Sequence, residues 1–408
     1  MTTKDFAFGR WAGALACVGA LVLASPADAQ MPAPASAPEQ NQVQSGWFRY
    51  GAGIDKAWDI AAHPGRQGWI SIKRKGEELG VGKRILVLYP RPSSAYDIAI
   101  TKILQVFETK GLSTQFTVIN FSMDDRRGTE AIQFAEKNKV DLIFSMGSES
   151  TAWLYDHYRG GSIPVVSVCS KDPVQLGQVK DYNSGSRTNF AFTSLNVPVD
   201  VQMTYVRELR PDLKNLAVLV DSKNVSAMQT QAEPIAEYAK HRGIQVIWGA
   251  VQNPAKAKEE LVPIVRDAVA TMRKSDPDLT KSVFWITGST SVFLEIRTIN
   301  EHSDRVPVLS VVPEIVRAGA DTAVLGIGIS FESNAHLAAI YGHDILNGKV
   351  KAGDVKVGVV SPPDIAISFL KAREIGLKVP FPFFENASFV YDYEGRPVRT
   401  IASKMSDN

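Results

Sequence analysis

Short apolar runs alternate with amphipathic segments along most of the chain. A short apolar run bounded by turn residues is typical of a buried strand, and apolar residues three or four apart are typical of a helix. In the first half, this pattern predicts strands at 85–89, 116–121, 142–144, 163–168 and 190–193. Helical spacing lies between them, at 96–109, 128–138 and in the amphipathic segment before 163. The alternation predicts a parallel sheet with helices on both faces.

The same alternation restarts after residue 198. Helices are expected at 199–209, 226–242, 257–272 and 289–300, and strands at 216–221, 245–251, 283–287 and 308–312. An apolar run at 323–329, a helix at 332–346, a strand at 355–360 and a helix at 366–375 follow. The segment 389–399 predicts a terminal hairpin or an edge strand. The predicted fold class is α/β, with two doubly wound parallel-sheet lobes joined by a hinge.

Polar residues follow the predicted strands of the first half, most clearly in the stretch 141–173. Ligands of open parallel sheets bind outside the carboxyl ends of the strands. The candidate ligand-binding residues are therefore Tyr89, Ser93, Ser94, Tyr96, Gly147, Ser148, Glu149, Ser150 and Asp172. Ser148, Glu149 and Ser150 stand where a helix is expected to begin, so capping explains them as well as ligand contact does, and one residue can do both. Asp172 could pair with a ligand ammonium or act as a turn residue before Pro173.

The predicted strands of the second half end in a similar way. The candidates here are Asp221, Asn224, Thr287, Ser289 and Thr290. The segment 287–290 could hold a ligand through backbone and hydroxyl donors, and helix capping by its Ser or Thr residues explains it equally well. Trp285 lies within a predicted strand, where we expect a core residue.

Length and charge narrow the class of protein. A chain of 408 residues exceeds what one compact core usually holds, which favours two lobes. The net charge is +2, and no basic stripe with interleaved aromatic residues occurs, so a nucleic-acid partner is not expected.

The N-terminal residues predict export. Lys4 and Arg10 precede an apolar run at 11–24. Ala27 and Ala29 then stand at the −3 and −1 positions of a signal-peptide cleavage site. We expect a signal peptide at 1–29, cleaved near Ala29, then a flexible linker at 30–45 and an aromatic-rich N-terminal extension at 46–82. The extension carries three tryptophans, which argue for packing rather than disorder.

Catalytic and metal-binding patterns are weak. After cleavage at Ala29, Cys169 would be the one cysteine left, so no intramolecular disulfide could form, and a buried thiol is favoured over a nucleophile. The six histidines are scattered without metal-ligand spacing, and residues 147–150 lack the Gly-x-Ser-x-Gly pattern of a nucleophile elbow. No catalytic residue, metal or cofactor is expected.

Several short motifs occur in a fixed order along the chain. They are DLI at 141–143, GS at 147–148, IPVV at 163–166, KDPV at 171–174 before Gly177, ELRP at 208–211, DILNG at 344–348 and GLKVP at 376–380. From about residue 83 to 382 the chain thereby resembles periplasmic substrate-binding proteins of ABC uptake systems with the type I two-lobed fold. It is most similar to the subgroup with members that bind aromatic amino acids. The turn NSGSRTN at 183–189 matches the family in part, and 46–82 is not part of its pattern.

The resemblance implies a discontinuous order of domains. Lobe one would comprise 83–193 plus 321–350, lobe two 194–320 plus 351–399, and 400–408 a tail, with three crossovers as the hinge. The implied function is a periplasmic receptor that closes on a small ligand, such as an amino acid or organic acid, and delivers it to an inner-membrane ABC permease. A monomer is expected. An exported sensor or co-receptor that docks through 46–82 is the alternative, and an exported α/β enzyme is the weakest hypothesis.

Overall fold

The computed structural model describes residues 40–42, 46–63, 65–77 and 82–400. The predicted signal peptide and most of the predicted linker lie outside these residues. Across the described part of the chain, no helix combines the length and the apolar character needed to cross a membrane.

The first sheet has seven strands. Their order across the sheet is β3 (Trp58–Ala62), β4 (Trp69–Arg74), β6 (Thr114–Asn120), β5 (Lys83–Tyr89), β7 (Leu142–Met146), β8 (Val165–Val168) and β9 (Phe190–Ala191). The strands from β6 to β9 are parallel, whereas β4 pairs antiparallel with both β3 and β6. The predicted parallel sheet is thus present, with two additional strands at one edge.

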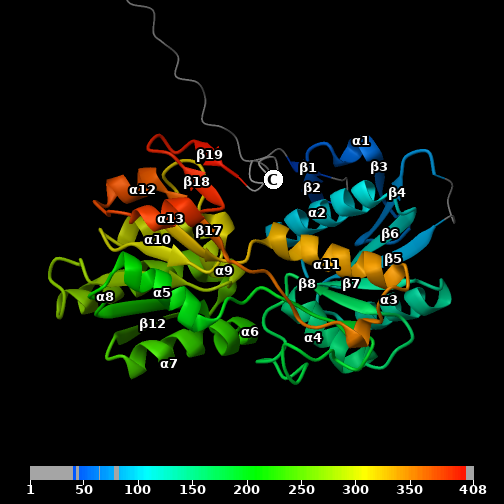
Figure 1. The fold of residues 1–408 in the computed structure, drawn as a ribbon, viewed down its shortest axis with the longest axis horizontal. Helices are drawn as coiled ribbons and strands as arrows, with labels where there is room; N and C mark the ends of the chain where they lie inside the picture. Colours follow the sequence, from blue (N-terminus) through cyan, green and yellow to red (C-terminus); the bar gives the residue numbers. More distant parts are fainter. Residues whose placement is uncertain (1–39, 43–45, 64, 78–81, 401–408) are drawn as a thin grey trace, which may run out of the picture. The chain divides into compact units, whose positions relative to one another are not determined.

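Helices cover both faces of this first sheet. In β5, Ile85 and Val87 pack into the core shared with α2 (Ser94–Lys110) and α11 (Phe331–Leu346), which lie side by side (Figure 1). The alternate residues of β5 pack against α3 (Asp125–Lys137) and α4 (Gly147–Tyr158) on the opposite face. Because both faces are buried, the central strands read as continuous apolar runs rather than as alternating ones.

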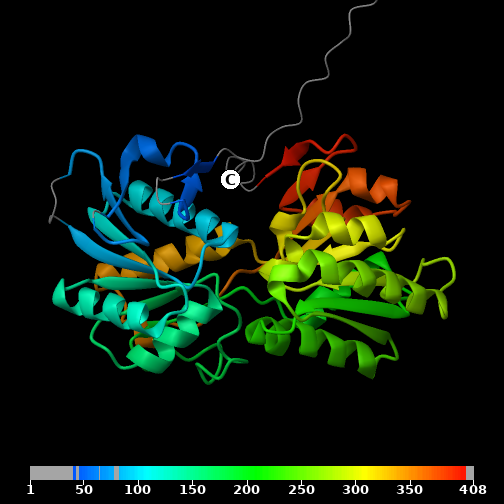
Figure 2. The same cartoon turned by 180° about the vertical axis from the view of Figure 1, so that it is seen from behind.

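The aromatic-rich segment 46–82 is part of lobe one rather than a separate extension. Its strands β3 and β4 extend the first sheet beyond β6, where they lie at the outer edge (Figure 2). Trp58 is 1% exposed and meets Phe116 of β6 edge-on, with ring centroids 5.6 Å apart. The shorter elements β1 (Gln40–Gln42), β2 (Arg49–Gly51) and α1 (Ile54–Ala57) precede this hairpin. The tryptophans therefore stabilise the core of lobe one.

The second sheet has eight strands. Their order is β12 (Gln245–Val251), β11 (Asn215–Asp221), β13 (Ser282–Ile286), β14 (Val308–Ser310), β15 (Leu325–Gly328), β17 (Asp364–Ser368), β18 (Phe389–Tyr391) and β19 (Pro397–Arg399). The five strands from β12 to β15 are parallel, β17 is antiparallel to β15, and β18 and β19 form the predicted terminal hairpin at the edge. Trp285 of β13 is fully buried, as expected of a core residue.

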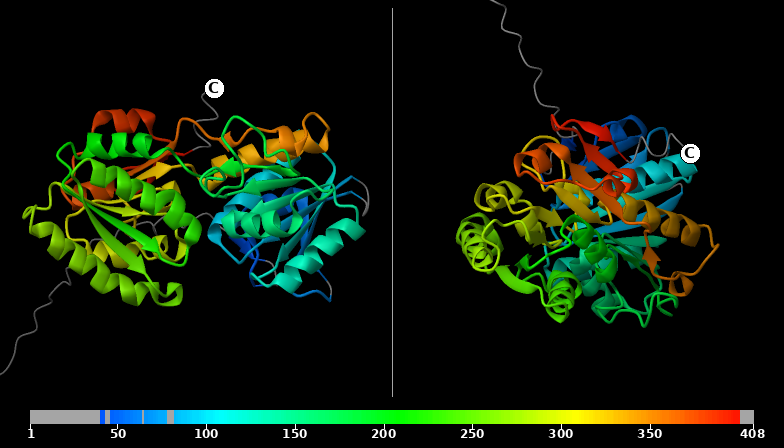
Figure 3. Two further views of the ribbon diagram at one scale, coloured as in Figure 1. Left: turned by 90° about the horizontal axis from the view of Figure 1, so that it is seen from below. Right: turned by 60° about the vertical axis from the view of Figure 1, so that its left-hand side comes forward.

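Helices also cover both faces of the second sheet (Figure 3). They are α5 (Val199–Leu209), α6 (Val225–Ala227), α7 (Glu233–His241), α8 (Ala257–Arg273), α9 (Thr290–Phe293), α10 (Ile296–His302), α12 (Phe369–Glu374) and α13 (Phe381–Asn386). The predicted helix at 289–300 is thus two short helices, and a π-helical turn at Met228–Ala232 joins α6 to α7.

Three sequence predictions near the C-terminus need correction. β15 pairs with β14 and β17 of the second sheet, so the crossover back to lobe one lies near 329–330 and not at 321. Residues 366–368, predicted as helical, belong to β17, because pairing with β15 outweighs their local helical spacing. The strand predicted at 355–360 is limited to β16 (Gly358–Val359).

Three crossovers join the two lobes, and two of them pair with each other. β10 (Thr193–Ser194) and β16 form a two-stranded parallel ladder. The third crossover leads into α11, where Asn334 is fully buried. The Asn334 side chain accepts the backbone N–H of Cys169 at 2.7 Å, and it donates to the Ser194 carbonyl at 3.1 Å. One amide therefore holds a first-sheet strand end, a crossover and α11 together.

Replacing Asn334 with alanine should destabilise the protein. The change leaves the buried Cys169 N–H and Ser194 carbonyl without partners, so we expect the free energy of unfolding to fall by about 2–4 kcal/mol. Urea denaturation measures it. Asn347→Ala, at the exposed end of the same helix, is the matched control and should have a much smaller effect. Equal losses in the two variants would contradict this role of Asn334.

Candidate functional site

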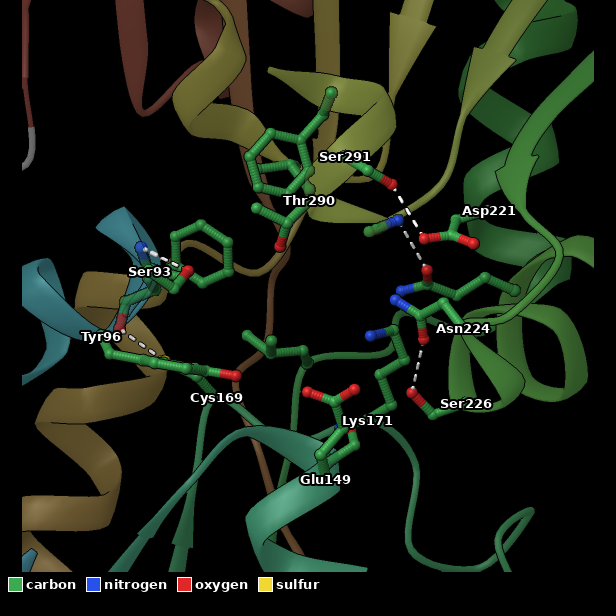
Figure 4. Close-up of a pocket in the computed structure, with 18 of the residues that line it drawn as sticks. Ser93, Tyr96, Glu149, Cys169, Lys171, Asp221, Asn224, Ser226, Thr290 and Ser291 are labelled. Atoms are coloured by element: carbon green, nitrogen blue, oxygen red, sulfur yellow. Dashed lines mark hydrogen bonds between the residues drawn. The ribbon is translucent and has the colours of Figure 1, made fainter. Parts of the chain in front are cut away.

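A cavity of about 320 Å³ lies where loops of the two sheets meet (Figure 4). Its lining includes residues after β5, β7 and β8 of lobe one and residues after β11, β13 and β14 of lobe two. These are carboxyl ends of parallel strands, as the sequence predicts for a ligand site. The volume is at the small end of the range of roughly 300–1,000 Å³ that is usual for small-molecule sites.

Two helix starts place polar groups in the lobe-one wall. The Ser93 hydroxyl caps α2 and accepts the backbone N–H of Ala95 at 3.3 Å. Ser148 and Glu149 lie in the first turn of α4, and the Glu149 carboxylate forms an ion pair with Arg91. The Ser148 hydroxyl accepts the backbone N–H of Lys171 at 2.9 Å, so its own proton points elsewhere.

The lobe-two wall is held by bonds among its own residues. Asp221 accepts the Ser291 hydroxyl and the Lys223 backbone N–H, each at 2.9 Å. The Asn224 side-chain oxygen caps α6 by accepting the N–H of Ala227 at 3.1 Å. Buried Gln231, from the π-helical turn, accepts the N–H of Gly288 at 2.7 Å. These bonds fix the polar groups before any ligand arrives, which lowers the entropic cost of binding.

The cavity lining also includes apolar residues. They are Tyr96, Leu195, Phe293, Val311, Val312, Ile329 and Phe331, and they come from both lobes. Burial raises the pKa of the Tyr96 phenol well above its usual range, so the ring is neutral at physiological pH. The lining thus combines fixed charged groups with aromatic rings, a combination suited to an amphipathic small molecule.

Seven of the predicted site residues line the cavity. They are Ser93, Tyr96, Ser148, Glu149, Asp221, Asn224 and Thr290. They follow or end four different strands, β5, β7, β11 and β13. The fold brings them together although up to about two hundred residues separate them in the sequence. This agreement concerns position in the structure; contact with a ligand stays a prediction.

The other seven predicted residues lie outside the cavity lining. Tyr89 is fully buried, and its hydroxyl donates to the Tyr96 carbonyl at 3.1 Å. Asp172 is a turn residue that accepts the N–H of Val174 and the Tyr182 hydroxyl. Ser150 donates to the Leu88 carbonyl at 3.1 Å. The remaining four are exposed Ser94, Gly147 at the start of α4, and the buried, mutually hydrogen-bonded Thr287 and Ser289.

Several lining residues were not predicted from the sequence. Lys171 and Cys169 follow β8, Gln231 lies inside a helical region, and Phe331 begins α11. Lys171 has the clearest sequence signal, because it is a charged residue at a strand end directly before an Asp-Pro turn. Gln231 and Phe331 carry no such signal, since their exposure to the cavity depends on how the lobes meet.

Cys169 is buried, as predicted, yet it also borders the cavity. Its backbone has a left-handed conformation with φ of 53°. Burial raises the pKa of the thiol well above its usual value, which disfavours the thiolate needed for nucleophilic chemistry. Among the described residues, no group of three or more His, Cys, Asp or Glu side chains is arranged to hold a metal ion.

The model of one protein family matches residues 108–387, which form most of this chain. That family is described as ABC transporter substrate binding protein. The chain belongs to this family. Members of this family are generally not enzymes. No curated protein matches the sequence of this substrate-binding protein.

Solved structures show that this substrate-binding protein has the type I periplasmic-binding-protein fold. A conserved domain protein from Vibrio cholerae is 18% identical, with 76% of this chain and 99% of that one covered and a TM-score of 0.61. A Streptococcus pneumonia ABC domain in complex with L-Trp is 17% identical, with 76% and 99% covered and a TM-score of 0.61. An open, ligand-free substrate binding protein with adhesive properties from Clostridium difficile is 19% identical, with 78% and 100% covered and a TM-score of 0.58.

Gly147 at the start of α4 should tolerate no side chain. It has φ of 77°, and an added Cβ would overlap the Tyr96 hydroxyl. Gly160 has φ of 84° with open space around it, so Gly160→Ala measures the backbone strain alone. We expect Gly147→Ala to lower the melting temperature clearly more than Gly160→Ala does, because it adds a clash to the strain of about 1 kcal/mol. Equal melting temperatures would show that the Tyr96 side chain can move aside without cost and does not restrict residue 147.

Proposed function

We propose that this protein is an exported receptor that binds a small molecule between its lobes and delivers it to an inner-membrane ABC permease. The observation that supports the proposal most is the cavity itself, since both lobes contribute its walls and three crossovers join them. Membership of the substrate-binding family supports the permease as partner. The predicted signal peptide supports a periplasmic location.

Binding would work by closure of the two lobes. A ligand that contacts both walls stabilises the closed arrangement by the free energy of those contacts, and lobe closure about short crossovers is a known hinge motion. No bond is made or broken in this mechanism. The closed, loaded form is the one that a permease would need to distinguish from the empty form.

The ligand is proposed to be an amino acid or another small organic acid. A lining that combines charged side chains with aromatic and aliphatic ones supports a molecule with a charged end and an apolar body. The L-Trp complex of the Streptococcus pneumonia domain is consistent with this class of ligand.

The alternative role as a sensor or co-receptor rested on segment 46–82 as a docking surface. That segment turns its tryptophans Trp58 and Trp69 into the core, where they are 1% and 5% exposed. Its strands complete the first sheet, so deleting it would uncover the edge of β6 and the core at Phe116 as well as remove any docking surface. The transport receptor is therefore the function we propose.

Isothermal titration calorimetry of the purified protein against amino acids and organic acids tests the proposal. We expect one site per chain and a negative heat-capacity change, because closure buries apolar surface. Failure of every small molecule to bind at millimolar concentration would refute the proposed function.

Thr290 offers a test of the lobe-two wall. Its hydroxyl points into the cavity (Figure 4), so Thr290→Val keeps the shape and removes one hydrogen bond to the ligand. We expect ligand affinity to fall about fivefold, which corresponds to about 1 kcal/mol for one hydrogen bond. Thr109→Val, at the exposed end of α2, is the control and should bind normally. Normal binding by Thr290→Val would remove Thr290 from the ligand site.

A further inference from the structure

Lys171 is a buried cation whose charge no neighbour neutralises by direct contact. Its residue is 8% exposed, and its side chain points into the cavity (Figure 4). Its backbone N–H donates to the Ser148 hydroxyl, whereas within the described residues its ammonium forms neither a hydrogen bond nor an ion pair. The aliphatic part of the Lys171 side chain lies close to Gly288 of lobe two: a Cβ added to that glycine would be 3.6 Å from the Lys171 Cε. The ammonium is therefore held at the meeting point of the lobes.

The two carboxylates of the cavity are already engaged by other groups. Glu149 is paired with Arg91 on the lobe-one side. Each Asp221 oxygen accepts one hydrogen bond from a neutral donor, the Lys223 backbone N–H or the Ser291 hydroxyl, which hold the carboxylate in place and leave its charge. The negative charge of Glu149 still acts on Lys171 from a distance, but it makes no ion pair with it. The cavity thus holds three cationic and two anionic side chains, which leaves one positive charge.

A buried ammonium without a partner costs free energy, which an anionic ligand group would offset. The first turn of α4 lies beside it, with Ser148 and Glu149 in the cavity lining. The N-terminus of a helix of this length also favours negative charge. The one positive charge left over in the lining is balanced by a ligand with a net negative charge, whereas a zwitterion would leave it unbalanced.

We infer that Lys171 binds the anionic group of the ligand, and that the ligand is a small organic anion whose recognition requires no ammonium group. The inference rests on the proposed function and narrows its ligand class. The apolar body of the anion would lie against Tyr96, Phe293 and Phe331, and the lobes would close over a neutralised charge.

The pH dependence of binding follows from the same geometry. Burial lowers the pKa of the Lys171 ammonium to about 8 in the empty cavity, with Glu149 opposing the shift. The group is charged below that pH, so affinity for an anion is greatest there and falls as the pH rises through it. The other titratable groups facing the cavity are Arg91, Glu149, Asp221, Lys223, Tyr96 and Cys169. Burial raises the pKa of the Tyr96 phenol and the Cys169 thiol, so both stay neutral across this range.

Charge-matched ligands test the inference by calorimetry on the mature protein. One set shares a phenyl body: 3-phenylpropanoate, phenylalanine, 3-phenylpropanamide and phenethylamine. Parallel sets carry an indole or an isobutyl body. We expect the carboxylate of at least one set to bind at least tenfold more tightly than its amide and amine, and no more weakly than its amino acid.

Two substitutions of Lys171 complete the test. Lys171→Met should weaken carboxylate binding at least tenfold and remove its pH dependence near 8, while raising the melting temperature of the empty protein, because a buried charge is gone. Lys171→Arg should keep the preference for anions, and the pH at which affinity for the carboxylate falls should be higher than in the original protein. Lys180→Met, an exposed cation outside the cavity, is the control and should bind normally.

The outcomes separate the inference from the proposed function. If an amine or amide binds as well as its carboxylate, or if Lys171→Met binds carboxylates normally, the inference is wrong and the receptor function stands. If the amino acid binds at least tenfold more tightly than its carboxylate, an ammonium site exists and the inference is also wrong. If no member of any set binds, the inference is wrong; the proposed function falls with it only if the wider titration against amino acids and organic acids also finds no ligand.

Discussion

The buried amide of Asn334 is the contact on which the arrangement of the site most depends. It lies in the first turns of α11, just after one crossover, and it bonds to a second crossover and to the backbone that leaves β8. That backbone continues directly into Lys171. The hydrogen bonds of one buried side chain therefore connect the crossovers of the hinge to the wall of the cavity. A two-lobed receptor needs such coupling, because its walls must keep their local geometry while the lobes move.

The cavity combines this rigid frame with an incomplete balance of charge. Its carboxylates and amides are held by neighbours, whereas the Lys171 ammonium is not. Fixed polar groups lower the entropic cost of binding. The unbalanced cation makes the free energy of binding depend on the charge of the ligand. An empty cavity carries this charge at some cost in stability. A ligand that neutralises it would gain affinity from the same burial that makes the empty site unfavourable.

Much of the fold could be predicted from the sequence, because both sheets consist mainly of apolar runs between amphipathic helices. The helix at 199–209 and the terminal hairpin are examples. Residues 366–368 of β17 have helical spacing in the sequence, since antiparallel pairing with β15 is a tertiary effect that local spacing does not report. Half of the predicted site residues line the cavity because strand ends converge there. Gln231 and Phe331 could not be predicted, as only the packing of distant segments brings them to the cavity.

Closure of the lobes on a ligand is the central claim, and the distance between the lobes tests it most directly. Spin labels at Glu130 on α3 and Glu237 on α7 would report that distance by pulsed electron paramagnetic resonance, since both residues are exposed and lie on different lobes. Addition of a ligand identified by calorimetry should replace a broad or long distance distribution with a shorter, narrower one. An unchanged distribution at saturating ligand would contradict a receptor that signals its loading by closure.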